Sequence, residues 1–310
     1  MRDKIYGVVY GTAIGDALGW PVEFNSTVTP SNPKVTKDAV PRRFTDDTQM
    51  FRAVLEGMLR WSSGDVLVEQ LHADKHAIDA AAEEVAEEFI TWSKSPDNDR
   101  APGGSCMAGC RNLERGKPWR EAGVDSGGCG TAMRSQAYGL WFYEDSEHAA
   151  RWAAEHARMT HNHPMAQAAA AAVGAGTAAA IRGGPPARVL EPMLTAADAW
   201  DMQTNEMLCD AAQSRKESAD TILDRWRGWA GYEAVAASLW CFLRHPNDFE
   251  RAVLTAVNSP GDSDSLGAIT GALVGGRVGI SGIPKRWVQQ VEDSAGLEVL
   301  ASRVCKRLGL

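Results

Sequence analysis

The sequence predicts an all-α fold, a single compact globule of about a dozen helices. Apolar residues recur at helical spacing along almost the whole chain, whereas alternating apolar and polar runs of the strand type are nearly absent. Small side chains crowd two of the helical segments, Ala166 to Ala180 and Ala268 to Gly279. Because small residues let helix backbones approach closely, we expect these two segments to form central, tightly packed helices.

The individual helices are predicted from this periodicity. They are Gln49 to Trp61, Ile78 to Trp92, Glu147 to Arg158, Ala166 to Ile181, Arg188 to Trp200, Ser218 to Trp229, Asp248 to Val257, Asp264 to Val278 and Lys285 to Arg307.

Two proline-rich stretches interrupt the helical pattern and are predicted as loops, Asn25 to Arg43 and Ser93 to Gly104. The first loop joins Glu23 to an acidic cluster that begins at Thr45, so it is a natural lid over whatever binds there. A connection without any role is the alternative.

Composition narrows the class of protein. The 310 residues carry 40 acidic and 32 basic side chains, a net charge of -8, which disfavours a nucleic-acid partner. Six scattered cysteines and a charged start, Met1 to Lys4, predict a reduced, cytoplasmic protein. The alanine tract from Ala166 to Ala180 falls short of the about twenty apolar residues of a spanning helix, so no membrane partner is expected.

Two acidic clusters each stand at the start of a helical stretch, TDDT at residues 45 to 48 and DSDS at residues 262 to 265. Four carboxylates in one cleft would repel one another unless cations lay between them, and hard oxygen donors suit Mg²⁺ or Mn²⁺. Ordinary helix N-caps are the alternative, because Ser, Thr and Asp accept hydrogen bonds from free amides. If the clusters do meet, residues 1 to 310 form one domain.

Two further motifs complete a recognisable set. GDALG-W-P-V-E occupies residues 15 to 23, and GGCGTAMR occupies residues 127 to 134. The second acidic cluster is preceded by Gly261 and followed by GAITG at residues 267 to 271. In this order the motifs resemble those of the ADP-ribosylglycohydrolase family, and the resemblance covers nearly the whole chain.

The resemblance implies a dinuclear metal cleft holding two divalent cations, Mg²⁺ or Mn²⁺. The matching ligand positions are Thr45, Asp46, Asp47, Asp262, Asp264 and Ser265. Many members have Thr where this chain has Ser265, and the hydroxyl donor is kept. Glu23 is our choice for the carboxylate that acts on water or on the leaving group, with a surface or capping carboxylate as the alternative. Asp16 is expected to support the site from behind the ligands.

The glycine-rich loop is expected to bind ADP-ribose by pointing backbone amides at its diphosphate. The predicted binding residues are Ser126, Gly127, Gly128, Cys129, Gly130, Met133 and His161. Many members carry Gly-Asn-Gly where this chain has Gly-Cys-Gly, so the contact of that Asn side chain is absent here. His161 is equally well explained as a core histidine, and Arg134 as an internal salt bridge. The aromatic run from Trp141 to Tyr143 is expected in the core, with stacking on adenine as the alternative.

The resemblance implies metal-dependent hydrolysis of the glycosidic bond between ADP-ribose and an acceptor, with ADP-ribose as product. An ADP-ribosylated protein side chain is the favoured substrate, and a small acceptor remains open. A dimetal phosphoesterase, or an inactive member that binds ADP-ribose or a partner, are the alternatives. Which linkage is cleaved would be decided at the rim, expected at Asn25 to Arg43 and Ser93 to Met107.

Overall fold

The computed structural model describes residues 1–63 and 76–310, which fold into sixteen α-helices and three short 3₁₀ helices. β pairing within these ranges is limited to three isolated bridges. The all-α prediction is therefore confirmed. The elements are α1 (Arg2–Gly19), η1 (Trp20–Val22), α2 (Asp46–Trp61), α4 (Ala77–Ser93), α5 (Gly104–Glu114), α6 (Trp119–Ala122), η2 (Cys129–Thr131), α7 (Ala132–Trp141), α8 (Ser146–Ala157), α9 (Pro164–Arg182), α10 (Ala187–Asp198), α11 (Met202–Gln213), α12 (Ala219–Arg225), α13 (Gly231–Arg244), α14 (Phe249–Val257), α15 (Ser263–Val278), η3 (Ile280–Gly282), α16 (Lys285–Gln290) and α17 (Ser294–Arg307).

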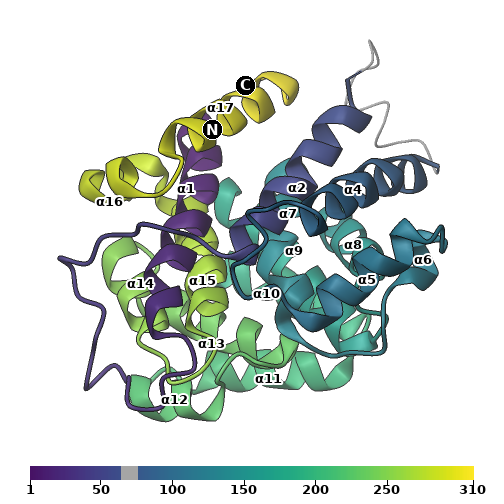
Figure 1. Cartoon of the computed structure of the whole chain (residues 1–310). Helices are drawn as coiled ribbons and strands as arrows, with labels where there is room; N and C mark the ends of the chain where they lie inside the picture. Colours follow the sequence, from purple (N-terminus) through teal and green to yellow (C-terminus); the bar gives the residue numbers. More distant parts are fainter. Residues whose placement is uncertain (64–75) are drawn as a thin grey trace.

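Helix α1 packs against α15 along a line of glycines, and the two run antiparallel (Figure 1). A Cβ atom added at Gly11 would overlap the carbonyl oxygen of Gly271, and one added at Gly15 would overlap that of Gly267. The two backbones are therefore in direct contact, as expected for the segment from Ala268 to Gly279. This contact brings the end of α1 beside the start of α15.

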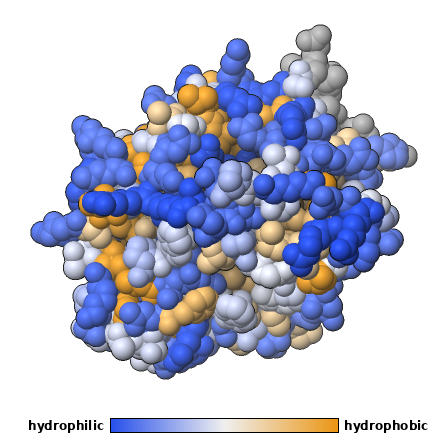
Figure 2. Space-filling model, in the orientation of Figure 1, coloured by the Kyte–Doolittle hydropathy of each residue, from blue (hydrophilic) through white to orange (hydrophobic). Residues whose placement is uncertain are grey.

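The alanine-rich helix α9 is long and apolar enough to cross a membrane by composition alone, but 89% of it is buried inside the protein. It packs against α7, α8 and α10. Its apolar character is thus explained by a place in the core, as predicted. Figure 2 shows the outer face of the molecule as largely hydrophilic, with scattered hydrophobic patches.

Several helices escaped the sequence prediction. Helices α1, α5, α6, α7, α11 and α13 were not assigned. Helix α1 is buried on nearly all sides and shows little amphipathic contrast, which hides its period. The predicted helix from Lys285 to Arg307 is wrong as a single element. It breaks into α16 and α17 at Asp293, which adopts a left-handed conformation with φ of 49° and accepts a hydrogen bond from the amide of Gly296. The helix expected from Ser218 to Trp229 ends at Arg225.

Both predicted loops are present, and the first lies against α14 (Figure 1). Asn258, the residue that ends α14, receives hydrogen bonds on Oδ1 from the amides of Lys34 and Val35, and its Nδ2 donates to the carbonyl of Val35. The indole of Trp287 donates to the carbonyl of Ala39. These contacts hold the loop on the side of α14 and α16.

The entrance to α2 is fixed by a partly buried ion pair between Arg100 and Glu292. The Arg100 guanidinium donates to both oxygens of Glu292, at 2.6 and 3.0 Å, and to the carbonyl of Phe44 at 2.8 Å. Glu292 in turn accepts from the amide of Phe44. The residue directly before the first acidic cluster is thereby tied to two distant parts of the chain.

The glycine contact between α1 and α15 gives a stability prediction. Gly11→Ala should lower the free energy of unfolding by at least about 2 kcal/mol, because the new methyl group must push two helix backbones apart. Urea denaturation measures this change. Gly104→Ala is the control, because a Cβ there meets no atom within 4 Å. Equal stability of the two variants would contradict the packing described.

Candidate active site

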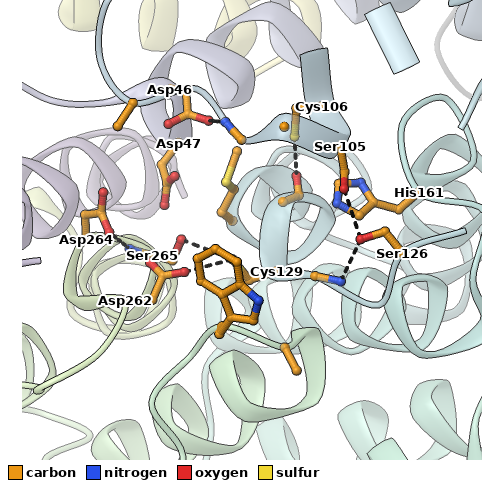
Figure 3. Close-up of a pocket in the computed structure, with 18 of the residues that line it drawn as sticks. Asp46, Asp47, Ser105, Cys106, Ser126, Cys129, His161, Asp262, Asp264 and Ser265 are labelled. Carbon is orange, nitrogen blue, oxygen red and sulfur yellow. Dashed lines mark hydrogen bonds between the residues drawn. The ribbon is translucent and has the colours of Figure 1, made fainter. Parts of the chain in front are cut away.

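One pocket of about 740 Å³ gathers nearly all the residues that the sequence singled out (Figure 3). Its size is typical of a small-molecule site. Every predicted site residue lines it except Thr45 and Asp16. The predicted site residues that line the pocket are Glu23, Asp46, Asp47, Ser126, Gly127, Gly128, Cys129, Gly130, Met133, His161, Asp262, Asp264 and Ser265.

The first acidic cluster forms the N-terminus of α2, and Asp16 of α1 lies directly behind it. The Asp16 carboxylate accepts hydrogen bonds from the amide of Thr45 at 2.9 Å and from the amide of Thr48 at 3.0 Å. Thr45 is the N-cap, with its Oγ1 accepting from the amide of Asp47 at 3.3 Å. Asp16 therefore takes the supporting position expected of it, and the capping alternative holds for the Thr45 side chain.

Asp46 and Asp47 are not used as caps and point into the pocket. Asp46 Oδ2 accepts a hydrogen bond from the amide of Gly103, at 3.1 Å. Asp47 is buried, and its Oδ2 has no hydrogen-bond partner among the described residues. A buried carboxylate oxygen without a donor is costly, which makes this atom a candidate cation ligand.

The second acidic cluster forms the N-terminus of α15. Asp262 is its N-cap and accepts from the amide of Ser265 at 3.4 Å, and Asp264 accepts from the same amide at 3.0 Å. Ser263 turns the other way and donates to the carbonyl of Gly19 in α1, at 3.0 Å. Carboxylate oxygens of Glu23, Asp262 and Asp264 lie within 4.8 Å of one another. Helix capping and metal binding are thus compatible in this cluster.

Burial raises the pKa values of Asp16, Glu23, Asp46, Asp47 and Asp264. Burial is the largest cause at each position. It raises the pKa of Asp16 to about 6, that of Glu23 to about 7 and that of Asp46 to about 8. The pKa values of Asp47 and Asp264 lie well above the usual range for the same reason, with neighbouring aspartates adding to the shift.

The donor chemistry fits hard divalent cations. None of the described lining residues is Lys or Arg, so the protein itself supplies no positive side chain to balance the carboxylates. Oxygen donors from α2, α15 and Glu23 face one another, and the Asp47 Oδ2 atom lacks a donor. Mg²⁺ or Mn²⁺ would balance the carboxylate charge and would give the Asp47 Oδ2 atom a partner.

His161 lies at the opposite side of the pocket and is neutral. Burial lowers its pKa to about 3, and the charge of Arg134 acts in the same direction. The Thr160 hydroxyl accepts a hydrogen bond from Arg134 at 2.7 Å and lies 2.8 Å from His161 Nδ1. Donation of the hydroxyl proton to Nδ1 leaves the ring proton on Nε2, next to Gly128. His161 thereby presents a hydrogen-bond donor beside the glycine-rich loop.

The glycine-rich loop offers fewer free amides than its sequence suggests. The amide of Gly128 donates to Ser126 Oγ at 3.4 Å, and that of Cys129 donates to the carbonyl of Trp229 at 3.1 Å. An anion cradle would therefore rest on the other amides of the loop. Close packing explains one of the glycines as well, because a Cβ at Gly130 would lie 2.7 Å from the sulfur of Cys106.

Known proteins are similar to this chain in sequence and in fold. The family description ADP-ribosylglycohydrolase matches residues 1–309. The chain belongs to the ADP-ribosylglycohydrolase family. This membership confirms the predicted resemblance and the predicted enzyme class, a hydrolase acting on glycosidic bonds of ADP-ribose.

Similar members of the ADP-ribosylglycohydrolase family match the chain over almost its whole length. The ADP-ribosyl-[dinitrogen reductase] glycohydrolase of Rhodospirillum rubrum is 26% identical, with 96% of this chain and 94% of that protein covered. The ADP-ribosylarginine hydrolase Tri1 of Pseudomonas putida is 27% identical, with 98% and 78% covered. A solved ADP-ribosylglycohydrolase-related protein complex superposes with a TM-score of 0.77 at 25% identity, covering 99% of this chain and 98% of that one.

The rim of the glycohydrolase pocket differs from the one predicted. Residues 101–106 line it, as expected for the second loop, but no residue of the loop Asn25 to Arg43 does. That loop is held against α14, so this structure does not place it as a lid. Instead, Phe24 and Trp229 form the rim, with ring centroids 5.4 Å apart and side chains 49% and 69% exposed.

The aromatic rim residues had weak signals in the sequence. Trp229 was taken as the end of a helix, but the chain leaves the helix after Arg225 and Gly228 adopts a φ of 91°. Met165, Ala230 and Tyr232 also line the pocket and were missed. The available signal in the sequence was Gly228 directly before Trp229, because a glycine at that place indicates that the helix has ended.

Two open assignments of the sequence are settled by burial. Arg134 is buried and donates to the carbonyl of Gly130 and to the Thr160 hydroxyl, so it is internal, although the described residues give it no carboxylate partner. Trp141 and Phe142 are core residues, as expected, whereas Tyr143 is only partly buried and packs against the core.

The raised pKa values predict how the metal-free protein responds to pH. Asp16, Glu23 and Asp46 hold their protons more tightly in the folded chain than in the unfolded chain, so the folded state binds more protons between pH about 4 and about 8. Stability in excess chelator should be greatest near pH 4 to 5 and should fall as pH rises to 8. Thermal melting across this range measures the effect.

The matched variant for this test is Asp46→Asn, which keeps an acceptor for the amide of Gly103. It should flatten the pH dependence in chelator. Saturating Mg²⁺ or Mn²⁺ should raise the melting temperature of the wild type most at pH 8, where the carboxylates are charged. If the melting temperature changes neither with pH nor with added metal, the two acidic clusters act only as helix caps.

Proposed function

We propose that the protein hydrolyses the glycosidic bond that links ADP-ribose to an acceptor, in a reaction that needs divalent cations, and that the acceptor is a protein side chain. The observation that carries the proposal is the pocket itself, in which two acidic helix N-termini, Glu23 and the glycine-rich loop face one cavity. Relatives named for ADP-ribosylated dinitrogen reductase and for ADP-ribosylarginine support a protein acceptor.

Metal ions bound between the clusters would supply positive charge that orients the ribose hydroxyls and polarises water. The residues that would hold them are Asp46, Asp47, Asp262, Asp264 and Ser265. Thr45, which was also expected as a ligand, caps α2 and does not line the pocket. Asp16 keeps the α2 terminus in position by binding the amides of Thr45 and Thr48. The rigidity of these donors comes from the helices that carry them.

Glu23 is the proposed acid or base. Its carboxyl lies within 4.8 Å of those of Asp262 and Asp264, and burial with the charge of Asp262 raises its pKa to about 7. A group that titrates near neutral pH can both accept a proton from water and give one to the leaving group. Cleavage at an anomeric carbon requires such transfer, because its transition state carries developing positive charge.

The opposite side of the pocket would bind the ADP-ribose part. His161 offers its Nε2 proton there, and the glycine-rich loop approaches without side chains that would block a diphosphate. A dimetal phosphoesterase would use the same carboxylates but gives no specific role to this loop. An inactive binding member would not need a complete set of oxygen donors.

Replacing Glu23 tests the proposed chemistry. Glu23→Gln should lower kcat by roughly a hundredfold or more while the affinity for ADP-ribose changes little, because the amide keeps the shape but cannot move a proton. Release of ADP-ribose from ADP-ribosylated arginine and serine peptides, with Mg²⁺ or Mn²⁺, is the measurement. Glu121→Gln, on the exposed face of α6, is the control.

The products separate the competing functions. Hydrolysis at the glycosidic bond yields ADP-ribose and an unmodified acceptor. A phosphoesterase would yield AMP and leave ribose phosphate on the acceptor, and an inactive member would bind without turnover. If excess chelator leaves the rate of hydrolysis unchanged, the reaction does not need divalent cations.

The aromatic rim predicts where the acceptor is recognised. Trp229→Ala should raise KM for an ADP-ribosylated peptide roughly three- to tenfold and leave kcat nearly unchanged, because an aromatic contact contributes about 1 kcal/mol. Met202→Ala, which removes an exposed side chain on α11, is the control. Lys37→Ala tests the loop first expected at the rim. A larger effect at Lys37 than at Trp229 would restore that loop as the acceptor site.

A further inference from the structure

The thiol of Cys129 lies against the second acidic cluster (Figure 3). Its sulfur is 2.9 Å from Oδ2 of Asp262 and 3.7 Å from Oγ of Ser265. Both of these residues belong to the proposed set of metal ligands. Cys129 is therefore in direct contact with the cleft, on the side that faces the glycine-rich loop.

The backbone fixes this thiol in place. The Cys129 amide donates to the carbonyl of Trp229, and the next carbonyl, that of Gly130, accepts from the buried Arg134 guanidinium at 2.9 Å. Cys106 also lines the pocket, but its sulfur points elsewhere, 3.9 Å from the Gly130 carbonyl. Of these two thiols, only that of Cys129 points toward a carboxylate of the cleft, that of Asp262.

The thiol and the carboxylate are close enough to bind one ion. A sulfur and an oxygen bound to a tetrahedral Zn²⁺ at about 2.3 and 2.1 Å lie roughly 3.6 Å apart. The Cys129 thiol already faces the Asp262 carboxylate, to which it donates a hydrogen bond at 2.9 Å. A second observation also points to a cation here, because Asp47 is 3% exposed, lines the same pocket and has an Oδ2 without a hydrogen-bond donor.

We propose that Cys129 is a sulfur ligand of this cleft, which therefore binds thiophilic divalent cations such as Zn²⁺ or Cd²⁺ through Cys129 and Asp262. The inference rests on the proposed function in so far as it takes the acidic cleft to hold divalent cations. When the metal–sulfur bond forms, the S–H bond breaks and its proton passes to the solvent, with no change of oxidation state. Mg²⁺ and Mn²⁺ prefer oxygen and gain little from the thiol.

Cadmium binding to the full-length metal-free protein tests the proposal. Cd²⁺ bound to a thiolate absorbs in the ultraviolet, whereas Cd²⁺ held by oxygen alone does not, so the titration reports the sulfur contact directly. In the wild type this absorbance should reach its maximum at one Cd²⁺ per chain. Cys129→Ser should lose it, and its Cd²⁺ affinity should fall about tenfold or more while its Mn²⁺ affinity stays within about twofold.

Cys106→Ser is the matched control, because it removes a buried thiol from the same pocket and should keep the band. Cys129→Asn places there the residue that many members of the family carry, and it should bind Cd²⁺ as weakly as the serine variant. The ¹¹³Cd chemical shift of the wild-type complex separates sulfur from oxygen ligation without any variant. A shift typical of oxygen ligands alone would overturn the proposal.

The outcomes also separate this inference from the proposed function. If Mn²⁺ binds the wild type but Cd²⁺ shows no sulfur band, or if the band survives in Cys129→Ser, Cys129 is not a ligand and the metal-dependent hydrolase still stands. If Cd²⁺ binds through Cys129 while neither Mg²⁺ nor Mn²⁺ binds, the inference stands and the metal dependence of the proposed hydrolase fails.

Discussion

The backbone contact between α1 and α15 is the constraint on which the site depends. Glycines face glycines or backbone along both helices, so the two axes approach more closely than side chains would allow. Because the helices run antiparallel, the end of α1 meets the start of α15, and Ser263 donates to the carbonyl of Gly19. Asp16, Glu23 and Asp262 are thereby brought together although more than two hundred residues separate the first two from the third. A bulkier residue in this interface would separate these carboxyl groups as well as the helices.

The same closeness creates an electrostatic cost that the rest of the site manages. Asp16 is stabilised by the amides of Thr45 and Thr48, and the entrance to α2 is tied down by Arg100 and Glu292. Asp47 has no such partner on Oδ2, and the pKa values of the clustered carboxyls rise because burial and like charges disfavour their ionised forms. The proposed cations would relieve this repulsion.

Strain gathers at the mouth of the pocket. Phe24 and Ala101 adopt left-handed backbone conformations, with φ of 51° and 53°, and both line the pocket. Such conformations cost of order 1 kcal/mol or more for residues with a side chain and persist where surrounding contacts enforce them. The amide of Phe24 donates to the carbonyl of Gly261, directly before the second acidic cluster. The aromatic rim and the second acidic cluster are thus linked through a backbone hydrogen bond.

The sequence by itself determined the helical class, because the helical period is a local property of the chain. Its four motifs, through their resemblance to a family, also named most of the residues that line the pocket. It did not determine helix α1, since a helix buried on most of its surface has no polar face to reveal its period. It placed the loop from Asn25 to Arg43 over the site, whereas side-chain contacts from Asn258 and Trp287 hold that loop elsewhere. The aromatic rim and the contact between Cys129 and Asp262 likewise arise only when segments distant in sequence pack together, and packing of that kind leaves no local pattern.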